Sequence, residues 1–152
     1  MIFVTVGTTM PFDELIEEVD RLSGEGFFNE QVVCQTGQSR CAPKRCEHFR
    51  YAPDLGAYMA AASFLIVHGG TGSVIEAMLT NKPFLAFANP RAADDHQGQF
   101  LSRIGNEYGV VWSRNCAELS RLFLSASRRG RRMPSNEPAR LAGAIFDLCS
   151  RK

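Results

Sequence analysis

The sequence lacks an excess of charge of either sign. Its 152 residues include 17 Lys and Arg and 16 Asp and Glu, for a formal net charge of +1. A protein that binds nucleic acid through its overall charge normally carries a strong basic surplus, so we expect no nucleic-acid partner. Hydrophobic residues make up 45% of the chain, enough for the core of one domain, and we expect a single domain over 1–152.

Long apolar runs are also missing. The most apolar stretch, AYMAAASFLIV at 57–67, is too short to cross a bilayer. The N-terminus, MIFVTVGTT, has neither the basic lead nor the small-residue cleavage site of a secretory signal. We therefore expect a cytoplasmic protein, in which cysteine thiols stay reduced.

Metal-ligand patterns are equally scarce. The five cysteines are an odd number and unevenly spaced: Cys34, Cys41, Cys46, Cys116 and Cys149. Four residues separate Cys41 from Cys46, but no second pair with the spacing of metal ligands accompanies them. Asp94 and Asp95 are the only adjacent carboxylates in the loops that matter below. We predict neither a bound metal nor a cofactor.

Short apolar runs alternate with amphipathic stretches along the chain. This alternation predicts an α/β fold with a single Rossmann-like, doubly wound parallel sheet of about six strands. We expect strands at 2–6, 31–36, 48–52, 63–68, 84–89 and 109–113. We expect helices at 11–22, 54–62, about 70–80, 94–108, 116–127 and about 137–149, with the core in 1–125.

Two glycine-bearing turns follow expected strands. A G-x-x-x-x-G-K-[ST] phosphate loop is absent, and the G-x-G-x-x-G fingerprint fails because Ile75 takes its last position. Glycine still lets the backbone approach an anion, and a helix that follows presents free N–H groups. A diphosphate therefore fits over the second turn, facing the first. The residues concerned are Gly70, Thr71, Gly72 and Ser73 in the second turn and Gly7, Thr8 and Thr9 in the first.

Glu76 and His68, both close to the second turn, have two interpretations each. Ser73 and Glu76 match a capping box, in which each side chain bonds to the backbone at the start of one helix. Alternatively, Glu76 accepts hydrogen bonds from both hydroxyls of a ribose, since a carboxylate offers several acceptor positions. His68 is either a general base or, as we favour, a structural residue that bonds across the glycine turn.

The motifs HGGTGSVIEAM, NKPFLAFANP and DDHQ, together with the opening VTVGTTMPFDELI, occur in an order that carries a family resemblance. Over roughly residues 1–125 the chain resembles the glycosyltransferase family 28 C-terminal domain, the donor-binding half of a two-domain glycosyltransferase. It is most similar to free-standing donor-binding subunits. Examples are the catalytic subunit of the dolichol-pathway N-acetylglucosaminyltransferase and bacterial exopolysaccharide glucuronosyltransferase subunits.

The resemblance implies a role for each matching residue. Gly7, Thr8 and Thr9 would line the diphosphate, while Gly70, Thr71, Gly72 and Ser73 would close over it. Tyr51 and Ala52 would flank the uracil, Glu76 would bind the ribose, and Asp95, His96 and Gln97 would reach the hexose. Thr36, Gly37 and Gln38 would border the same cleft.

Two of these assignments have structural alternatives, and a third has none. Tyr51 is also consistent with a core aromatic residue, and His96 with an ordinary surface residue. For Gln97 we see no structural reason in the sequence. The family's long members continue with an Asn-Ala pair after the HQ, whereas this chain has Gly98, which weakens a helix by about 1 kcal/mol relative to alanine.

The resemblance also implies a reaction and its partners. We expect the catalytic subunit of a two-subunit inverting hexosyltransferase that takes a UDP-sugar donor, carrying N-acetylglucosamine or glucuronic acid, and a lipid-linked sugar acceptor in polysaccharide synthesis. The chain is too short for the acceptor half, so we expect a membrane-anchored acceptor-binding subunit that recruits this chain to the inner face of the membrane. We assign no catalytic residue.

Two alternatives remain open at this stage. The chain is also consistent with a non-catalytic regulatory module that binds a nucleotide sugar. The basic run at 128–132 (Arg128, Arg129, Arg131 and Arg132) is either a solvated loop or a membrane contact worth about 1 kcal/mol per residue on an anionic leaflet.

Overall fold

A sheet of six parallel strands forms the centre of the molecule. The computed structural model describes residues 1–92 and 95–129. The strands are β1 (Ile2–Thr5), β2 (Val32–Gln35), β3 (Glu47–Phe49), β4 (Phe64–His68), β5 (Phe84–Phe87) and β6 (Val111–Ser113). Their order is β3-β2-β1-β4-β5-β6, and every neighbouring pair is parallel. The predicted fold class is confirmed.

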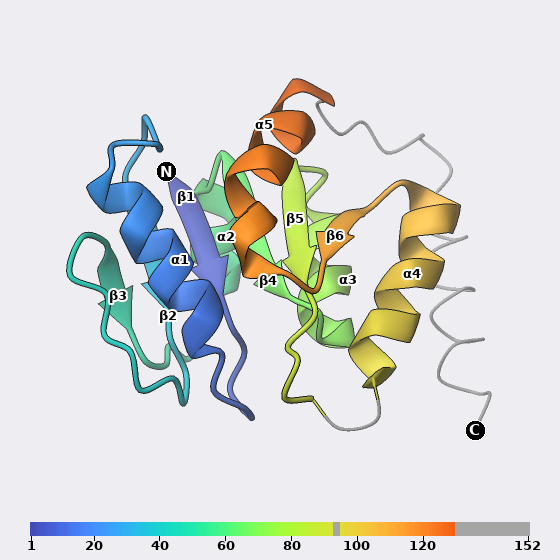
Figure 1. Cartoon of the computed structure of the whole chain (residues 1–152), viewed down its shortest axis with the longest axis horizontal. Coiled ribbons are helices and arrows are strands. Elements are labelled where there is room, and N and C mark those ends of the chain that lie inside the picture. The colour runs from blue at the N-terminus through green and yellow to red at the C-terminus, as the bar shows by residue number, and fades with distance from the viewer. Residues whose placement is uncertain (93–94, 130–152) are drawn as a thin grey trace.

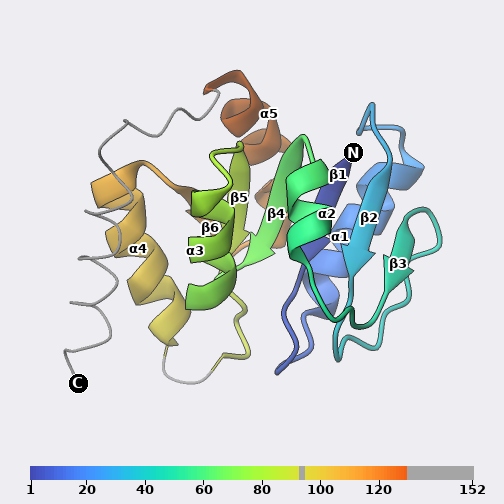
Figure 2. The same ribbon diagram turned by 180° about the vertical axis from the view of Figure 1, so that it is seen from behind.

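Helices cover both faces of the sheet. They are α1 (Asp13–Gly24), α2 (Gly56–Ala61), α3 (Thr71–Leu79), α4 (His96–Tyr108) and α5 (Leu119–Arg129), with a short 3-10 helix, η2 (Cys116–Glu118), before α5. Figure 1 shows α1 and α5 in front of the sheet, and Figure 2 shows α2 and α3 in front of the opposite face. This is a doubly wound arrangement.

The burial pattern explains why the strands read as unbroken apolar runs. All four residues of β1 are buried, with Ile2 and Val4 in the core under α1 and Phe3 in the core under α3. A strand covered on both faces has no polar side, so alternation disappears from its sequence. The same holds for β4 and β5, whose apolar residues are all buried.

The connection between β2 and β3 contains no helix. The connection runs along α1. Two carboxylates of this helix each accept hydrogen bonds from two backbone N–H groups of the connection, at 2.6–3.0 Å. Asp13 accepts from Arg40 and Cys41, and Asp20 accepts from Lys44 and Arg45. These bonds give acceptors to backbone N–H groups of the loop that would otherwise be unpaired.

Two differences from the predicted element boundaries affect residues discussed above. β3 ends at Phe49 rather than at residue 52. α5 continues to Arg129, so the first two arginines of the basic run lie in a helix rather than in a loop. The predicted helix at about 137–149, Arg131, Arg132 and Asp94 lie outside the described residues. Within the described residues, no helix combines the length and the apolar character needed to span a membrane.

The centre of the sheet is a topological switch point. β1 and β4 are neighbours, and the chain proceeds from β1 outwards to β3 on one side and from β4 outwards to β6 on the other. In open parallel sheets, ligands bind beyond the carboxyl ends of the strands at such a point. The two glycine-bearing turns follow β1 and β4.

Candidate functional site

The glycine turns at the switch point enclose the imidazole of His68, the last residue of β4. We call Gly7–Thr9 and Gly69–Gly70 the central bends. A Cβ atom added at Gly7 would lie 2.6 Å from His68 Cε1 and Nε2, and one added at Gly70 would overlap His68 Nε2. Gly7 also has a φ of +78°, which favours glycine by itself. Both bends therefore need glycine in order to hold this ring.

His68 is neutral in this environment. Burial lowers its pKa from 6.5 to about 4, so the ring carries no charge near pH 7. Its Nδ1 atom is buried and has no hydrogen-bond partner within the described part of the chain. A group with so low a pKa is a poor general base near neutrality. The favoured structural interpretation is correct as to position, because the ring lies across the glycine turn, but packing rather than a hydrogen bond holds it there.

The helix after the second bend presents free N–H groups. α3 starts at Thr71, and Gly70, the N-cap residue with an extended backbone, provides no side-chain cap. The first N–H groups of a helix have no intrahelical acceptor and form its positive end. Because Ser73 is the third residue of α3 rather than its cap, the capping-box interpretation of Ser73 and Glu76 is wrong.

A groove of about 740 Å³ lies between α2 and α3. This volume is within the range of pockets that hold small molecules. Exposed Glu76, on α3, lines one side, and Ala52, in the loop after β3, lines the other. The groove thus brings together two of the predicted site residues, one assigned to ribose and one to the base. Tyr51, next to Ala52, is 54% exposed, which excludes the core-aromatic alternative.

Two buried polar residues, Thr5 and Gln35, support these loops and were missed by the sequence analysis. Thr5 Oγ1 donates to Gln35 Oε1 at 2.7 Å, and Gln35 Nε2 donates to the carbonyl oxygens of Gly7 at 3.1 Å and Arg50 at 2.8 Å. Thr5 is 0% exposed and Gln35 is 1% exposed. The available signal was a polar residue at the end of each apolar strand, since a buried polar group must find partners.

The residue Gln97 also has a structural partner. Its Oε1 accepts from the backbone N–H of Asn89 at 2.8 Å, and Asn89 Nδ2 donates to the carbonyl of Pro11 at 2.9 Å. These bonds join the loop after β5 both to α4 and to the loop after β1. The expectation that Gln97 has no structural role is therefore wrong, while its contact with a hexose remains a prediction.

The turn before α4 is exposed. Asp95 has a φ of +51° at the N-cap, and its Oδ2 pairs with Arg114 Nη2 at 2.6 Å. Arg114 also lies over the ring of Trp112, 5.2 Å from its centroid. A Cβ at Gly98 would overlap Arg114 and Asp95, so this departure from the family pattern makes room for the ion pair. His96 is exposed, as its surface alternative expected.

The fold gathers the predicted site residues at one edge of the sheet. They occupy the loops or helix starts after β1, β3, β4 and β5, the edge toward which the arrowheads point in Figure 1. The turn at Thr36–Gln38 is packed against the first bend, since a Cβ at Gly37 would overlap the Gly7 carbonyl. Within residues 1–92 and 95–129, no group of three or more His, Cys, Asp or Glu side chains is arranged to hold a metal ion.

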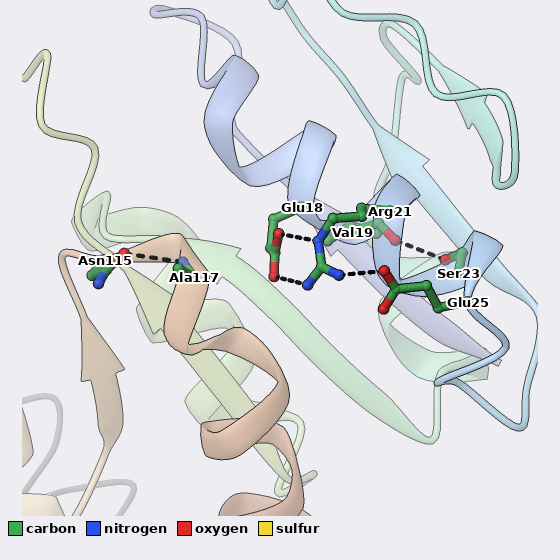
Figure 3. A network of polar contacts seen from close by, with 7 residues as sticks. All are labelled: Glu18, Val19, Arg21, Ser23, Glu25, Asn115 and Ala117. Atoms are coloured by element: carbon green, nitrogen blue, oxygen red, sulfur yellow. Dashed lines mark hydrogen bonds and ion pairs between the residues drawn. The ribbon is translucent and has the colours of Figure 1, made fainter.

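A second groove of about 460 Å³, between α1 and η2, has a different character. Four of its charged residues, Glu14, Glu18, Arg21 and Arg114, form ion pairs. Arg21 bonds to Glu18 at 2.7 and 2.9 Å and to Glu25 at 2.5 Å. Figure 3 shows these contacts, with Asn115 accepting from the N–H of Ala117 nearby. These carboxylates raise the pKa of Arg21. None of the predicted site residues lines this groove.

The sheet order and the glycine bends at the switch point define the class, a doubly wound α/β domain of the Rossmann type. Residues 1–123 match the model of the glycosyltransferase family 28 C-terminal domain. The chain belongs to this family. Its membership confirms the resemblance found in the sequence.

Individual relatives agree with this assignment. The chain is 32% identical to the UDP-N-acetylglucosamine transferase subunit ALG13 of Yarrowia lipolytica over 110 residues, 64% of this chain and 56% of the relative. It is 32% identical to the subunit of the same name from Mus musculus over 131 residues, 78% of this chain and 11% of the relative. The chain thus spans little more than half of the first relative and a small part of the second.

Solved structures support the fold. An NMR solution structure of ALG13 has a TM-score of 0.58 and 22% identity, with 91% of each chain covered. The crystal structure of the glycotransferase of kitacinnamycin has a TM-score of 0.58 and 17% identity, and the match covers 99% of this chain and 40% of that one. The domain therefore has the fold of one part of a larger glycosyltransferase.

Proposed function

We propose that this chain is the donor-binding subunit of a two-subunit inverting glycosyltransferase that transfers N-acetylglucosamine from a UDP-sugar to a lipid-linked acceptor. The observation that carries the proposal is the pair of glycine bends around a neutral His68, next to a groove that contains Glu76. Relatives described as UDP-N-acetylglucosamine transferase subunits favour this sugar over glucuronic acid.

The donor would lie along the carboxyl edge of the sheet. Its diphosphate would accept from the N–H groups at the start of α3 and face the bend at Gly7–Thr9. From there the ribose would reach Glu76 and the uracil would meet the loop at Tyr51–Ala52. The hexose would point toward Asp95–Gln97.

The chemistry of this half would be stabilisation of the leaving group. As the bond from the anomeric carbon to the diphosphate breaks, negative charge grows on the departing UDP, and fixed N–H groups stabilise that charge. His68 adds a further donor. With Nδ1 buried and unpaired, the tautomer that carries its proton on Nε2 avoids a buried N–H without an acceptor, and Nε2 lies next to both bends.

A second subunit would supply the acceptor site and the base. Inverting transfer requires a base within hydrogen-bond reach of the acceptor hydroxyl, and His68, with a pKa of about 4, does not fit that role. A lipid-linked acceptor requires contact with a membrane, which favours a membrane-anchored partner that recruits this chain from the cytoplasm. The relatives' description as a subunit agrees with this division of labour.

Titration calorimetry and a transfer assay test the proposal together. Purified protein is titrated with UDP, UDP-N-acetylglucosamine, UDP-glucuronic acid and ADP-glucose, and we expect the first two to bind and ADP-glucose not to bind. Transfer to a polyprenyl-diphosphate sugar is then measured with and without the co-expressed partner. Full turnover by this chain alone would contradict the two-subunit model. Binding without turnover in any pairing would favour a regulatory module.

A further inference from the structure

Gln35 occupies an unusual place for an uncharged amide. It is the last residue of β2, is 1% exposed, and lies between the loops that follow β1 and β3. Its Nε2 donates to Gly7 O and to Arg50 O, so both amide hydrogens are used, and its Oε1 accepts from Thr5 Oγ1. One buried side chain thus bonds to the backbone of two loops that are far apart in sequence.

These bonds fix the orientation of two peptide planes. In a trans peptide the carbonyl and the N–H of the next residue point in opposite directions, and the described chain has no cis peptide bond. Because Gly7 O points at Gln35, the N–H of Thr8 points away from Gln35. The same argument applies to Arg50 O, which also accepts from the N–H of Gly37 at 3.1 Å, and to the N–H of Tyr51.

Neither of these N–H groups is used within the protein. In the described part of the chain, the backbone N–H groups of Thr8 and Tyr51 donate to no other residue. Both residues are exposed. Gly37 completes the arrangement, because a Cβ at this position would overlap the Gly7 carbonyl and displace it from Gln35. The fold therefore holds two free donors in fixed directions on the ligand edge of the sheet.

We propose that Gln35 is a positioning residue that aligns the N–H of Thr8 with the diphosphate and the N–H of Tyr51 with the nucleobase of the donor. This inference rests on the proposed donor site. It makes the two halves of UDP recognition dependent on one buried amide. A change at Gln35 then weakens both contacts at once, although Gln35 touches neither part of the ligand.

The test compares Gln35→Met with Gln31→Met. Methionine preserves the length of the side chain but removes both amide hydrogens. Gln31 is the matched control because it is exposed, lies just before the opposite end of β2, and its side chain has one bond within the described residues, from Nε2 to Glu47 Oε1 at 2.7 Å. We expect Gln35→Met to weaken UDP binding by about tenfold or more, the loss expected when donors to a charged group are misaligned, and Gln31→Met to leave it unchanged.

Amide hydrogen exchange provides a measurement that would not change in this way if Gln35 had only a structural role. We expect UDP to slow exchange at Thr8 and Tyr51 in the wild-type protein. In Gln35→Met this protection should disappear at both residues while protection at Thr71, in α3, remains. A folded Gln35→Met protein with wild-type affinity and protection would overturn the inference. If Gln35→Met does not fold, the second variant is Thr5→Val, which removes the hydroxyl donor to Gln35. It should weaken binding severalfold and reduce protection at Thr8 and Tyr51. Unchanged affinity and protection in Thr5→Val would overturn the inference.

Failure of the proposed function gives a different result. If the wild-type protein binds no UDP, the donor site is wrong. The positioning is then judged in the free protein, from a crystal structure of Gln35→Met or, failing that, of Thr5→Val. A Gly7 carbonyl that keeps its direction in the variant would overturn the inference, and a rotated Gly7–Thr8 peptide would support it.

Discussion

The central bends and the turn before α4 belong to the same edge of the sheet but are built differently. The bends pack around His68, and the buried pair Thr5 and Gln35 bonds to the first of them. The outer turn, which we define as Asp95–Gln97, is held by Gln97 and by the ion pair of Asp95 with Arg114, whose side chains are 54% and 53% exposed. One region is set by burial, and the other largely by surface chemistry.

This difference matches the parts of the donor that each region would contact. Every UDP-sugar has the same diphosphate, so a rigid site that tolerates few substitutions suits the central bends. Sugars differ in their hydroxyl groups, and an exposed turn can change its contacts without disturbing the core. Exposed ion pairs contribute about 0–1 kcal/mol, whereas a buried polar group that loses its partner costs about 1–3 kcal/mol. We therefore expect mutations to have graded effects from the centre outwards.

The largest effect is expected at Gly70. Gly70→Ala places a methyl group on the ring of His68, and we expect a loss of about 1–3 kcal/mol in the free energy of unfolding together with loss of measurable UDP binding. Gly72→Ala is the matched control for stability, because a Cβ there meets nothing and alanine is the better helix former by up to about 1 kcal/mol. Urea denaturation and calorimetry measure both quantities. A Gly70→Ala protein as stable as the wild type would contradict the described packing.

Acidification should affect the centre next. The folded protein keeps His68 neutral down to a pKa of about 4, while an unfolded chain protonates it near 6.5. The unfolded state therefore binds more protons between these values, and the free energy of unfolding falls as the pH drops through this window. At pH 5 we expect a loss of ~2 kcal/mol relative to pH 7.

The comparison that isolates this effect is His68→Gln. Glutamine does not titrate, so the variant should lose less stability than the wild type between pH 7 and pH 5 in urea denaturation. The exposed His48 and His96 are present in both proteins, so their contribution cancels. Equal pH dependence in the two proteins would show that His68 is not buried as described.

The sequence predicted the strands well for a physical reason. In a sheet covered on both faces, each strand is an uninterrupted apolar run, and such runs are visible without knowledge of the fold. The capping-box interpretation failed because it depends on backbone angles instead. Ser73 and Glu76 have the spacing of a capping box, but the helix starts at Thr71, and no pattern in the sequence fixes the residue at which the backbone becomes helical.

The two bends were predicted because one residue type carries its own signal there. Glycine marks a bend by itself, so the bends at Gly7 and Gly70 could be found. Gln35 could not, since its importance comes from β2 lying between β1 and β3, which only the topology reveals. Gln97 was misjudged for a similar reason, because its partner Asn89 is contributed by another loop.

The groove beside the centre should give an intermediate effect. Glu76→Ala should weaken UDP and UDP-sugar binding at least tenfold, about 1.4 kcal/mol, because the ribose loses a charged acceptor while the exposed position leaves the fold intact. Calorimetry measures the affinity, and circular dichroism confirms folding. Glu17→Ala, at an exposed position on α1, is the control and should bind as the wild type does. An unfolded Glu76→Ala protein would show that Glu76 has a structural role.

The smallest effect is expected at the outer turn. Arg114→Ala removes an exposed partner of Asp95, so the free energy of unfolding should fall by less than about 1 kcal/mol. The affinity for UDP should not change, because the proposed donor placement keeps the nucleotide and the diphosphate away from this turn, whereas the additional affinity of the complete UDP-sugar should fall a few fold. Arg103→Ala is the control, since it breaks an ion pair with Glu107 within α4 and leaves Asp95 and Arg114 in place. If Arg114→Ala instead weakened UDP itself as strongly as Glu76→Ala does, the outer turn would form part of the nucleotide site, and the distinction between a fixed centre and an adaptable edge would not hold.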